Sequence, residues 1–282
     1  MSLLQLKHIC KSFSGVYANE NINLSVEKGE IHALLGENGA GKTTTISLLS
    51  TLLLPTKGEI LIDGQKLTRN RPDLKRKISV ITQEYSMRQD MNMDEIMEYQ
   101  GRLYFMPRKE IKRRTEELLE FCDLIKFRKR TVRKLSGGMK RKLMVCRALL
   151  TDPEILLLDE PTAGMDALSR RQMWNLLRKL NSKNLTILLT THYMEEAQNL
   201  CSRVALMDHG KLEEVNTPAG LIDSLGNYTV DEFAGDETHS HYFHSREEAI
   251  AYLSGLSGQA SLRETTLEDV FVERAGRHLM PS

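Results

Sequence analysis

The glycine-rich segment GENGAGKTT at residues 36–44 constrains the fold of this chain more than any other stretch. It matches the phosphate-binding pattern G-x-x-x-x-G-K-[ST], which requires a strand before it and a helix after it. The apolar run IHALL at 31–35 and the helical-looking TISLL at 45–49 fit these two requirements. Glycines let backbone N–H groups converge, and the N-terminus of the following helix favours negative charge, so we expect this loop to bind phosphate.

The residue types in the loop indicate how a nucleotide would be held. Lys42 can reach the β- and γ-phosphates, and the hydroxyl of Thr43 can ligate magnesium. A glycine-rich turn that binds nothing is the alternative, so the loop needs support from other segments. The loop residues expected to contact the nucleotide are Gly36, Glu37, Asn38, Gly39, Ala40, Gly41, Lys42, Thr43 and Thr44.

Two acidic residues follow a second apolar run, ILLLDE at 155–160, which has the pattern of a central parallel strand buried on both faces. Asp159 at the strand end is expected to point toward the phosphate loop of the neighbouring strand and to hold magnesium directly or through water. Glu160 lies about one residue further out, where it can polarise an attacking water. The alternative is that Asp159 only caps the next turn.

A third segment, LSGGM at 135–139, opens a predicted helix. Ser136 is a favourable N-cap, and the exposed amides of Ser136, Gly137 and Gly138 form a second potential anion site. An ordinary glycine-containing helix start is the alternative. Together with the first loop, this segment gives one chain two phosphate-binding helix starts.

The order of the predicted elements favours an α/β fold. Strands predicted at 3–9 and 22–26 flank a turn at Ser14 and Gly15, which indicates an antiparallel pair. Strands and helices then alternate, apart from a run of charged segments with helical spacing at about 84–150. We therefore expect a helical insertion in an otherwise alternating pattern.

Composition narrows the class of protein. The 282 residues carry a net charge of +1, but residues 108–142 hold fourteen Lys and Arg against five acids, and residues 213–282 hold thirteen acids against four bases. Two solvated faces, a basic surface near anionic lipid, and a contact between basic and acidic domains all fit this asymmetry. Because the basic stretch has no interleaved aromatic stripe, we expect no nucleic-acid partner. No apolar run is long enough to span a bilayer, and the N-terminus lacks the layout of a signal peptide.

These segments together resemble the ATP-binding subunit of an ABC transporter. The resemblance extends over residues 3–220, and the segments occur in the family's order and spacing. Residues 36–44 correspond to the family's Walker A loop, Gln83 to its Q-loop glutamine and residues 135–139 to its signature. Residues 155–160 correspond to the Walker B strand, residues 163–166 to the D-loop and His192 to the switch histidine. Met139 replaces the more usual glutamine of the signature, and Met165 replaces the common leucine of the D-loop.

The resemblance implies roles for further residues. In the family, two subunits pair head to tail, so that the signature of one chain covers ATP held by the Walker A loop of the other. Phe13 matches the aromatic residue that stacks on adenine, with Tyr17 as the alternative. Gln83 would contribute to catalysis and to Mg²⁺ binding, His192 would contact the γ-phosphate, and Asp166 would lie at the shared nucleotide site.

The predicted protein is thus an ATP- and Mg²⁺-dependent ATPase with a P-loop NTPase core of the ABC type, an antiparallel β subdomain and a helical insertion. We expect the ATPase domain at 1–220 and a small α+β extension at 221–282 with a regulatory or dimer-contact role, although a cargo-binding module is an alternative. The expected partners are a membrane-spanning permease subunit and a second copy of the chain or a homologous ATPase, at the cytoplasmic face of the membrane. An ABC-type module without a transport role and the ATPase of an importer remain alternatives.

The tail supports export. The sequence LEDVF at 267–271, with Gly276 and Arg277, resembles the ending of exporter subunits for drugs, lipids or polysaccharides. Strands are predicted at 227–233 and 239–244, followed by a helix that Ser245 caps and another that begins near Thr266. His239, His241 and His244 lack a fourth ligand at a recognisable spacing, so we interpret them as part of a solvated strand or loop.

Overall fold

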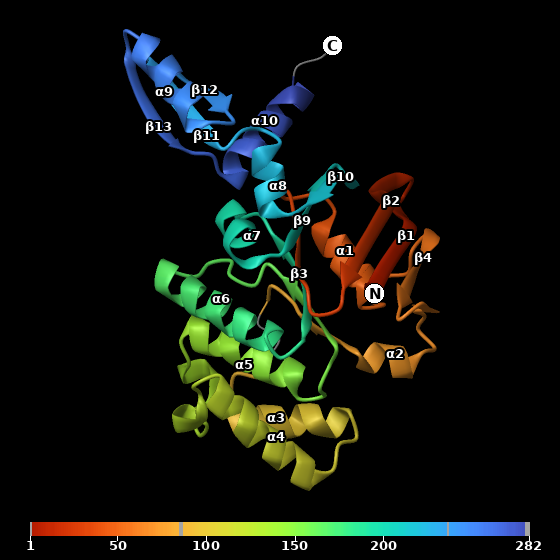
Figure 1. Cartoon of the computed structure of the whole chain (residues 1–282). Coiled ribbons are helices and arrows are strands. Elements are labelled where there is room, and N and C mark those ends of the chain that lie inside the picture. The colour runs from red at the N-terminus through yellow and green to blue at the C-terminus, as the bar shows by residue number, and fades with distance from the viewer. Residues whose placement is uncertain (1, 85–86, 236, 280–282) are drawn as a thin grey trace. The chain divides into compact units, whose positions relative to one another are not determined.

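The computed structural model describes residues 2–84, 87–235 and 237–279, with side chains up to Arg274 (Figure 1). The chain divides into two compact units, Met1–His192 with Ala205–Glu214 and Tyr193–Val204 with Val215–Ser282. Helix α7 belongs to the second unit, in which it packs against α8 and α10. The assignment of residues 1–220 to an ATPase domain remains a prediction, and Gly276 and Arg277 lie beyond the described side chains.

An antiparallel sheet with the strand order β2-β1-β4-β5 forms one part of the first unit. The predicted hairpin is present and longer than expected, because Ser14 and Gly15 join two strands of 12 residues each. Both turn residues have positive φ, as a tight hairpin turn requires. The bounds are β1 Ser2–Phe13, β2 Val16–Glu27, β4 Lys57–Ile62 and β5 Gln65–Lys66.

The second sheet has the strand order β10-β9-β3-β8-β7-β6 and carries the predicted site at one edge. Strands β3, β8, β7 and β6 pair in parallel, and β3, β7 and β8 are buried along their whole length, which confirms the prediction made for β7 from its continuous apolar run. The bounds are β3 Ile31–Leu35, β6 Ile78–Ile81, β7 Ile155–Asp159, β8 Thr186–Thr191, β9 Arg203–Asp208 and β10 Lys211–Asn216.

The strand order corrects one expectation. The strand that ends in Asp159 was expected beside the strand that enters the phosphate loop, but β8 lies between β7 and β3. The side chain of Thr43 nevertheless reaches Asp159, because both residues lie at the carboxyl edge of the same sheet.

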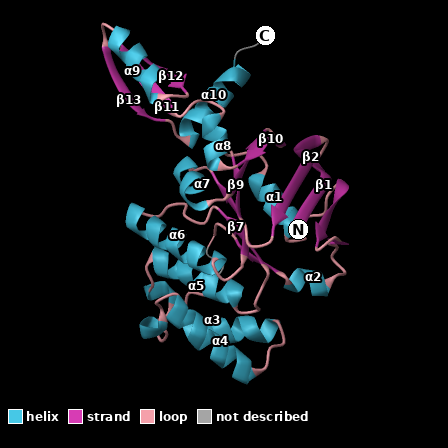
Figure 2. Ribbon diagram, in the orientation of Figure 1, coloured by secondary structure: helices cyan, strands magenta, loops and turns pink. Residues whose placement is uncertain are grey.

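Helices fill the predicted insertion, and the described part of residues 84–150 contains no strand (Figure 2). Asn92 and Glu95 form a capping box at the start of α3, and Ser136 caps α5 by accepting a hydrogen bond from the Met139 amide. The bounds in this unit are α1 Lys42–Leu49, α2 Pro72–Arg76, α3 Met93–Leu103, α4 Arg108–Phe121, η1 Ile125–Phe127, η2 Val132–Lys134, α5 Gly137–Leu149 and α6 Ala167–Asn181.

The second unit has a three-stranded antiparallel sheet with the order β12-β11-β13, and α9 packs against all three strands. Two of these strands agree with the prediction, whereas β13 was not anticipated. The bounds are α7 Met194–Leu200, α8 Pro218–Asp223, β11 Tyr228–Ala234, β12 Glu237–Phe243, α9 Arg246–Gly255, β13 Gln259–Glu264 and α10 Leu267–Leu279.

An arginine between two carboxylates joins β11, β13 and the start of α10. The Arg263 guanidinium donates to Asp231 at 2.6 and 3.2 Å and to Asp269 through two hydrogen bonds of 2.7 Å. Asp269 also accepts from the amide and hydroxyl of Thr266 at 2.8 Å. Burial alone would raise the pKa of Asp269, but the hydrogen bonds from Arg263 and Thr266 outweigh it and lower this pKa.

We expect the Asp269→Asn substitution to destabilise the second unit by about 2 kcal/mol, because charge-assisted hydrogen bonds to a buried group are lost. The depressed pKa stabilises the folded state at any pH above the unfolded value of about 4, and this contribution disappears as pH falls through the folded value. Amide hydrogen exchange in β11 and β13 should therefore accelerate in the variant at pH 7. The difference from the parent should shrink below about pH 4.

Glu268→Gln serves as the control, since Glu268 is an exposed acid in the same first turn of α10. The chain's single tryptophan, Trp174, lies in the first unit, so its fluorescence reports on the unfolding of that unit alone. Equal exchange rates in the two variants, or an equally large shift of the Trp174 transition, would contradict this role for Asp269.

Candidate functional site

The site lies where four parallel strands end at the same edge of the sheet. The phosphate loop follows β3, Gln83 follows β6, Glu160 follows β7 and His192 follows β8. Since parallel strands place their carboxyl ends together, four segments far apart in the sequence meet there. They line a cavity of about 240 Å³, whose walls are Ala18, Asn38, Gly39, Gly41, Lys42, Thr43, Thr44, Gln83, Glu160 and His192.

Two glycines of the loop are required by close packing. A Cβ at Gly36 would lie 2.1 Å from the carbonyl oxygen of Met207, and one at Gly41 would lie 2.4 Å from that of Ala18. Gly41 also has a φ of 101°, in the region that glycine adopts without strain. These contacts fix the loop between β2 and β9 as it enters α1.

Lys42 is buried beside the loop it belongs to. Its ammonium donates to the carbonyl oxygens of Gly36 at 2.8 Å and Glu37 at 3.0 Å, and lies 3.7 Å from Glu160 Oε1. Burial lowers the pKa of Lys42, and the charge of Glu160 partly opposes this shift. The cation is therefore held at the cavity wall by weak acceptors that phosphate oxygens can replace.

Asp159 joins the loop helix to β8. The Thr43 hydroxyl donates to Asp159 Oδ1 at 3.1 Å, and the Thr190 hydroxyl donates to the same oxygen at 2.6 Å. Asp159 and Thr190 are buried, so these hydrogen bonds fix the direction of the carboxylate. A hydroxyl and a carboxylate at this edge are oxygen donors of the kind that Mg²⁺ prefers.

Glu160 lies between Lys42 and His192. Its Oε2 lies 2.7 Å from His192 Nδ1, while its Oε1 faces Lys42. The backbone at Glu160 has a φ of 49°, a conformation that ordinary residues seldom adopt, and its amide donates to the Thr190 hydroxyl at 3.1 Å. Strain of this kind is often found at functional sites, where the surroundings hold the backbone in place.

Several predicted residues lie outside this cavity. Phe13 and Tyr17 are exposed on β1 and β2, and the Lys11 ammonium lies 5.1 Å from the centre of the Phe13 ring. Ser136 and Asp166 cap helices α5 and α6, and a Cβ at Gly138 would lie 3.6 Å from Ser169 Oγ, so the signature and the D-loop are neighbours. The role of Phe13 in binding adenine, and the roles of Ser136, Gly137, Gly138 and Asp166, remain predictions.

The structure adds supporting residues that the sequence analysis did not single out. Asn19 is fully buried and donates to Thr45 Oγ1 at 2.9 Å, which ties β2 to the loop helix. Arg141, on α5, donates to carbonyl oxygens at the ends of two strands. The sequence carries little signal for either residue, because Asn19 begins a polar run at 19–21 and Arg141 is one of three consecutive cations after the signature segment.

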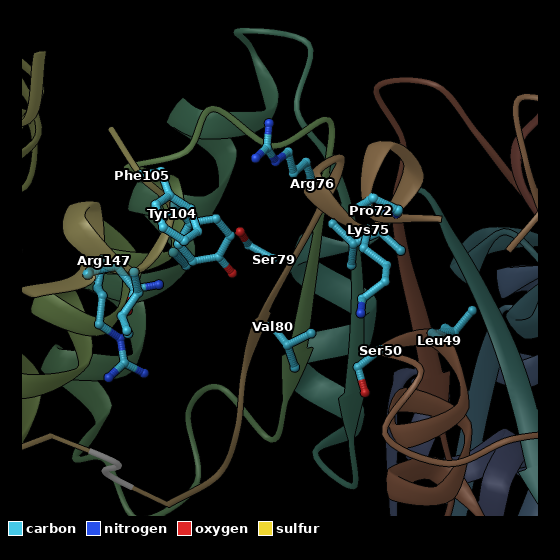
Figure 3. Close-up of a pocket in the computed structure, with 14 residues that line it drawn as sticks. Leu49, Ser50, Pro72, Lys75, Arg76, Ser79, Val80, Tyr104, Phe105 and Arg147 are labelled. Carbon is cyan, nitrogen blue, oxygen red and sulfur yellow. The ribbon is translucent and has the colours of Figure 1, made fainter. Parts of the chain in front are cut away.

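A larger groove of about 470 Å³ lies in the same unit (Figure 3). Figure 3 shows Tyr104 and Phe105 on one side, Lys75 and Leu49 on the other, and strand β6 between them. Its described lining includes three cationic residues and no acid: Leu49, Ser50, Pro72, Lys75, Arg76, Ile78, Ser79, Val80, Gln100, Leu103, Tyr104, Phe105, Arg147 and Ala148. The side chain of Phe105 is 88% exposed, and the exposed Leu103 and Tyr104 that precede it line the same groove, so the apolar surface here is more than one isolated side chain.

No described helix has both the length and the apolar character needed to cross a membrane.

Known sequences identify the family. The ABC transporter family pattern matches residues 19–163. The chain is 36% identical to the Nod factor export ATP-binding protein I of Cupriavidus metallidurans over 299 aligned positions, covering 99% of each sequence. It is 35% identical to the linearmycin resistance ATP-binding protein LnrL of Bacillus subtilis, covering 81% of this chain and 73% of that protein.

Solved structures agree with this assignment. The fold matches cbiO1 of Clostridium perfringens, part of an ABC transporter complex, with a TM-score of 0.73 and 25% identity over 78% of this chain and 90% of that one. It also matches a dimeric ATP-binding cassette bound to ADP and phosphate, with a TM-score of 0.67 and 28% identity over 76% and 98% of the two chains. The chain therefore belongs to the ABC transporter family, as an ATP-binding subunit with the family's ATPase fold and ATP-hydrolysing activity.

Proposed function

We propose that this chain pairs head to tail with a second copy or a homologous ATPase, hydrolyses ATP between the two, and drives a membrane-spanning exporter. The observation that carries the catalytic part is the position of Glu160 at the phosphate loop, 2.7 Å from His192. Similarity to subunits named for Nod factor export and for linearmycin and daunorubicin resistance supports export. The chain would then act at the cytoplasmic face of the membrane, held there by its partner.

Glu160 would accept a proton from the water that attacks the γ-phosphate. His192 Nδ1, 2.7 Å from one carboxylate oxygen, orients Glu160 and would contact the γ-phosphate with the rest of its ring. Lys42 would exchange its two carbonyl partners for phosphate oxygens. Amides of residues 36–44 would contact the same phosphates, and Phe13 would stack on adenine.

Mg²⁺ would be held by the Thr43 hydroxyl, the Gln83 amide and the Asp159 carboxylate, and when bound it would neutralise phosphate charge. The hydrogen bond from Thr43 to Asp159 already brings two of these donors together. The oxygen atoms of these three side chains are ligands of the kind that a hard cation such as Mg²⁺ prefers.

The groove beside β6 is a suitable docking site for the membrane-spanning subunit. Its aromatic wall and cationic rim favour an apolar segment that carries a carboxylate, since the described lining supplies no acid. Strand β6 forms the floor and ends at Ile81, two residues before Gln83. A partner that displaces this strand would therefore shift a residue of the nucleotide site.

The Glu160→Gln substitution should leave ATP binding intact, reduce kcat by at least about 100-fold, and trap an ATP-bound dimer, because the proton acceptor is lost but the hydrogen-bonding shape remains. Phosphate release and size-exclusion chromatography with ATP measure these effects. Glu154→Gln is a matched control, since Glu154 precedes the opposite end of β7 and pairs with Lys77. Undiminished hydrolysis in the Glu160 variant would rule out its catalytic role.

Substitutions in the signature, residues 135–139, should lower the rate of ATP hydrolysis but leave ATP binding by the monomer nearly unchanged. We expect Ser136→Ala and Gly138→Ala to lower kcat at least tenfold, while ATP affinity, measured at a concentration where the chain is monomeric, changes less than about threefold. Ser245→Ala is the control for loss of an N-cap, because Ser245 caps α9 in the same way. A large loss of monomer affinity in the signature variants would argue against a site shared between chains.

The docking groove predicts a different phenotype. Phe105→Glu should abolish co-purification of the membrane-spanning subunit, because it puts a charge where an apolar side chain would be buried. ATP binding by the isolated chain should not change. Phe233→Glu, at another exposed phenylalanine in the second unit, is the control. Normal assembly of the Phe105 variant would place the partner elsewhere.

A further inference from the structure

We propose that Arg141 is a positioning residue for ATP hydrolysis, one that holds the backbone of Glu160 and Gln83 as a single rigid unit. The proposal rests on the roles proposed above for these two residues. Arg141 lies on α5 and is 3% exposed. It lies outside the lining of the nucleotide cavity, so any effect on the reaction must pass through the groups it contacts.

The guanidinium lies between the ends of two strands. On the β7 side, Nε donates to Pro161 O at 2.8 Å, and Nη2 donates to Glu160 O at 2.8 Å and Asp159 O at 3.2 Å. On the β6 side, Nη1 donates to Thr82 O at 2.8 Å and to Gln83 O at 3.3 Å. An arginine has five N–H donors in one plane, and five backbone acceptors lie within reach.

The end of the pairing between β6 and β7 explains why a side chain with several hydrogen-bond donors is needed between these two segments. β6 and β7 pair in register up to Ile81 and Leu158, and beyond that pair the two segments separate to reach Gln83 and Glu160. The carbonyl groups of Asp159, Glu160 and Pro161 lie in a buried region, where unsatisfied acceptors are costly, and those of Thr82 and Gln83 lie at its part-buried edge. Arg141 replaces the missing ladder hydrogen bonds and so fixes the spacing between the two segments.

The same contact constrains the strained residue of the site. Glu160 has a φ of 49°, and its carbonyl oxygen accepts from Arg141 while its amide donates to Thr190. With both sides of the residue anchored, the carboxylate is directed toward Lys42 and His192. Loss of Arg141 would let Glu160 relax and move its carboxylate without removing any group expected to bind ATP.

The test is a comparison of kcat with ATP affinity in Arg141→Gln and Arg141→Lys, made in the full chain. We expect kcat to fall at least tenfold in Arg141→Gln and at least threefold in Arg141→Lys, while the Kd for ATP changes less than twofold. Lysine keeps the charge but carries its donors on one nitrogen, so it cannot span both sets of carbonyls. Any reduction in kcat smaller than threefold in Arg141→Gln would overturn the proposal.

Arg114→Gln and Arg114→Lys are the matched controls. Arg114, on α4, also donates to backbone carbonyls, those of Leu149 at 2.7 Å and Leu150 at 2.9 Å, but these lie away from the nucleotide cavity. We expect the controls to lower the melting temperature without lowering kcat by more than twofold. An equal fall of kcat in both series at matched melting temperatures would show general destabilisation and overturn the positioning role.

Circular dichroism establishes that each variant is folded before kcat is compared. If Arg141→Gln does not fold, Arg141→Lys decides alone, with a threefold loss of kcat as the threshold. Failure of this proposal is distinguishable from failure of the catalytic assignment. Hydrolysis that survives in Glu160→Gln contradicts the role of Glu160, whereas hydrolysis that survives only in the Arg141 variants contradicts the positioning role.

Discussion

The nucleotide site depends on hydrogen bonds that connect the ends of neighbouring strands. Asp159 Oδ1 accepts from Thr43 and from Thr190, so one carboxylate oxygen joins β7 to β8 and to the helix that follows β3. Because Asp159 and Thr190 are buried, the hydrogen bond between them acts in a low dielectric and holds its direction. Arg141 extends the same principle to β6, where side-chain donors replace a ladder that has ended.

Lys42 and Glu160 lie close enough to offset each other's charge before a nucleotide arrives. Lys42, Glu160 and His192 form a contiguous cluster in which each group has an opposite charge or a hydrogen-bonding partner nearby. The carbonyl groups that hold Lys42 are weaker partners than phosphate oxygens, so the cluster can open toward a nucleotide at modest cost. Pre-set dipoles and charges of this kind are worth more in a buried site than in water, which is the basis of electrostatic catalysis.

In the first unit, the surface groove that contains Phe105 is connected to the residues of the nucleotide site. The groove with Phe105 has β6 as its floor, and β6 leads to Gln83, whose carbonyl oxygen Arg141 holds. Helix α5 begins at Gly137 in the signature, and Arg141 lies about one turn further along it. The groove, the signature and the backbone of Glu160 are therefore joined by short connections through β6 and Arg141 within one compact unit, a suitable basis for coupling a partner's movement to hydrolysis.

The sequence by itself determined the fold class, the family and most residues at the nucleotide cavity, because a phosphate loop needs glycines, a lysine and a hydroxyl at fixed spacing. It also predicted the hairpin at Ser14 and the helical insertion, since turn residues and helical spacing are local signals. Only the tertiary structure decided that β8 lies between β3 and β7, that Arg141 bridges two strand ends, and that β13 completes the second sheet. Strand order and buried hydrogen bonds depend on contacts between distant residues, which local patterns do not encode.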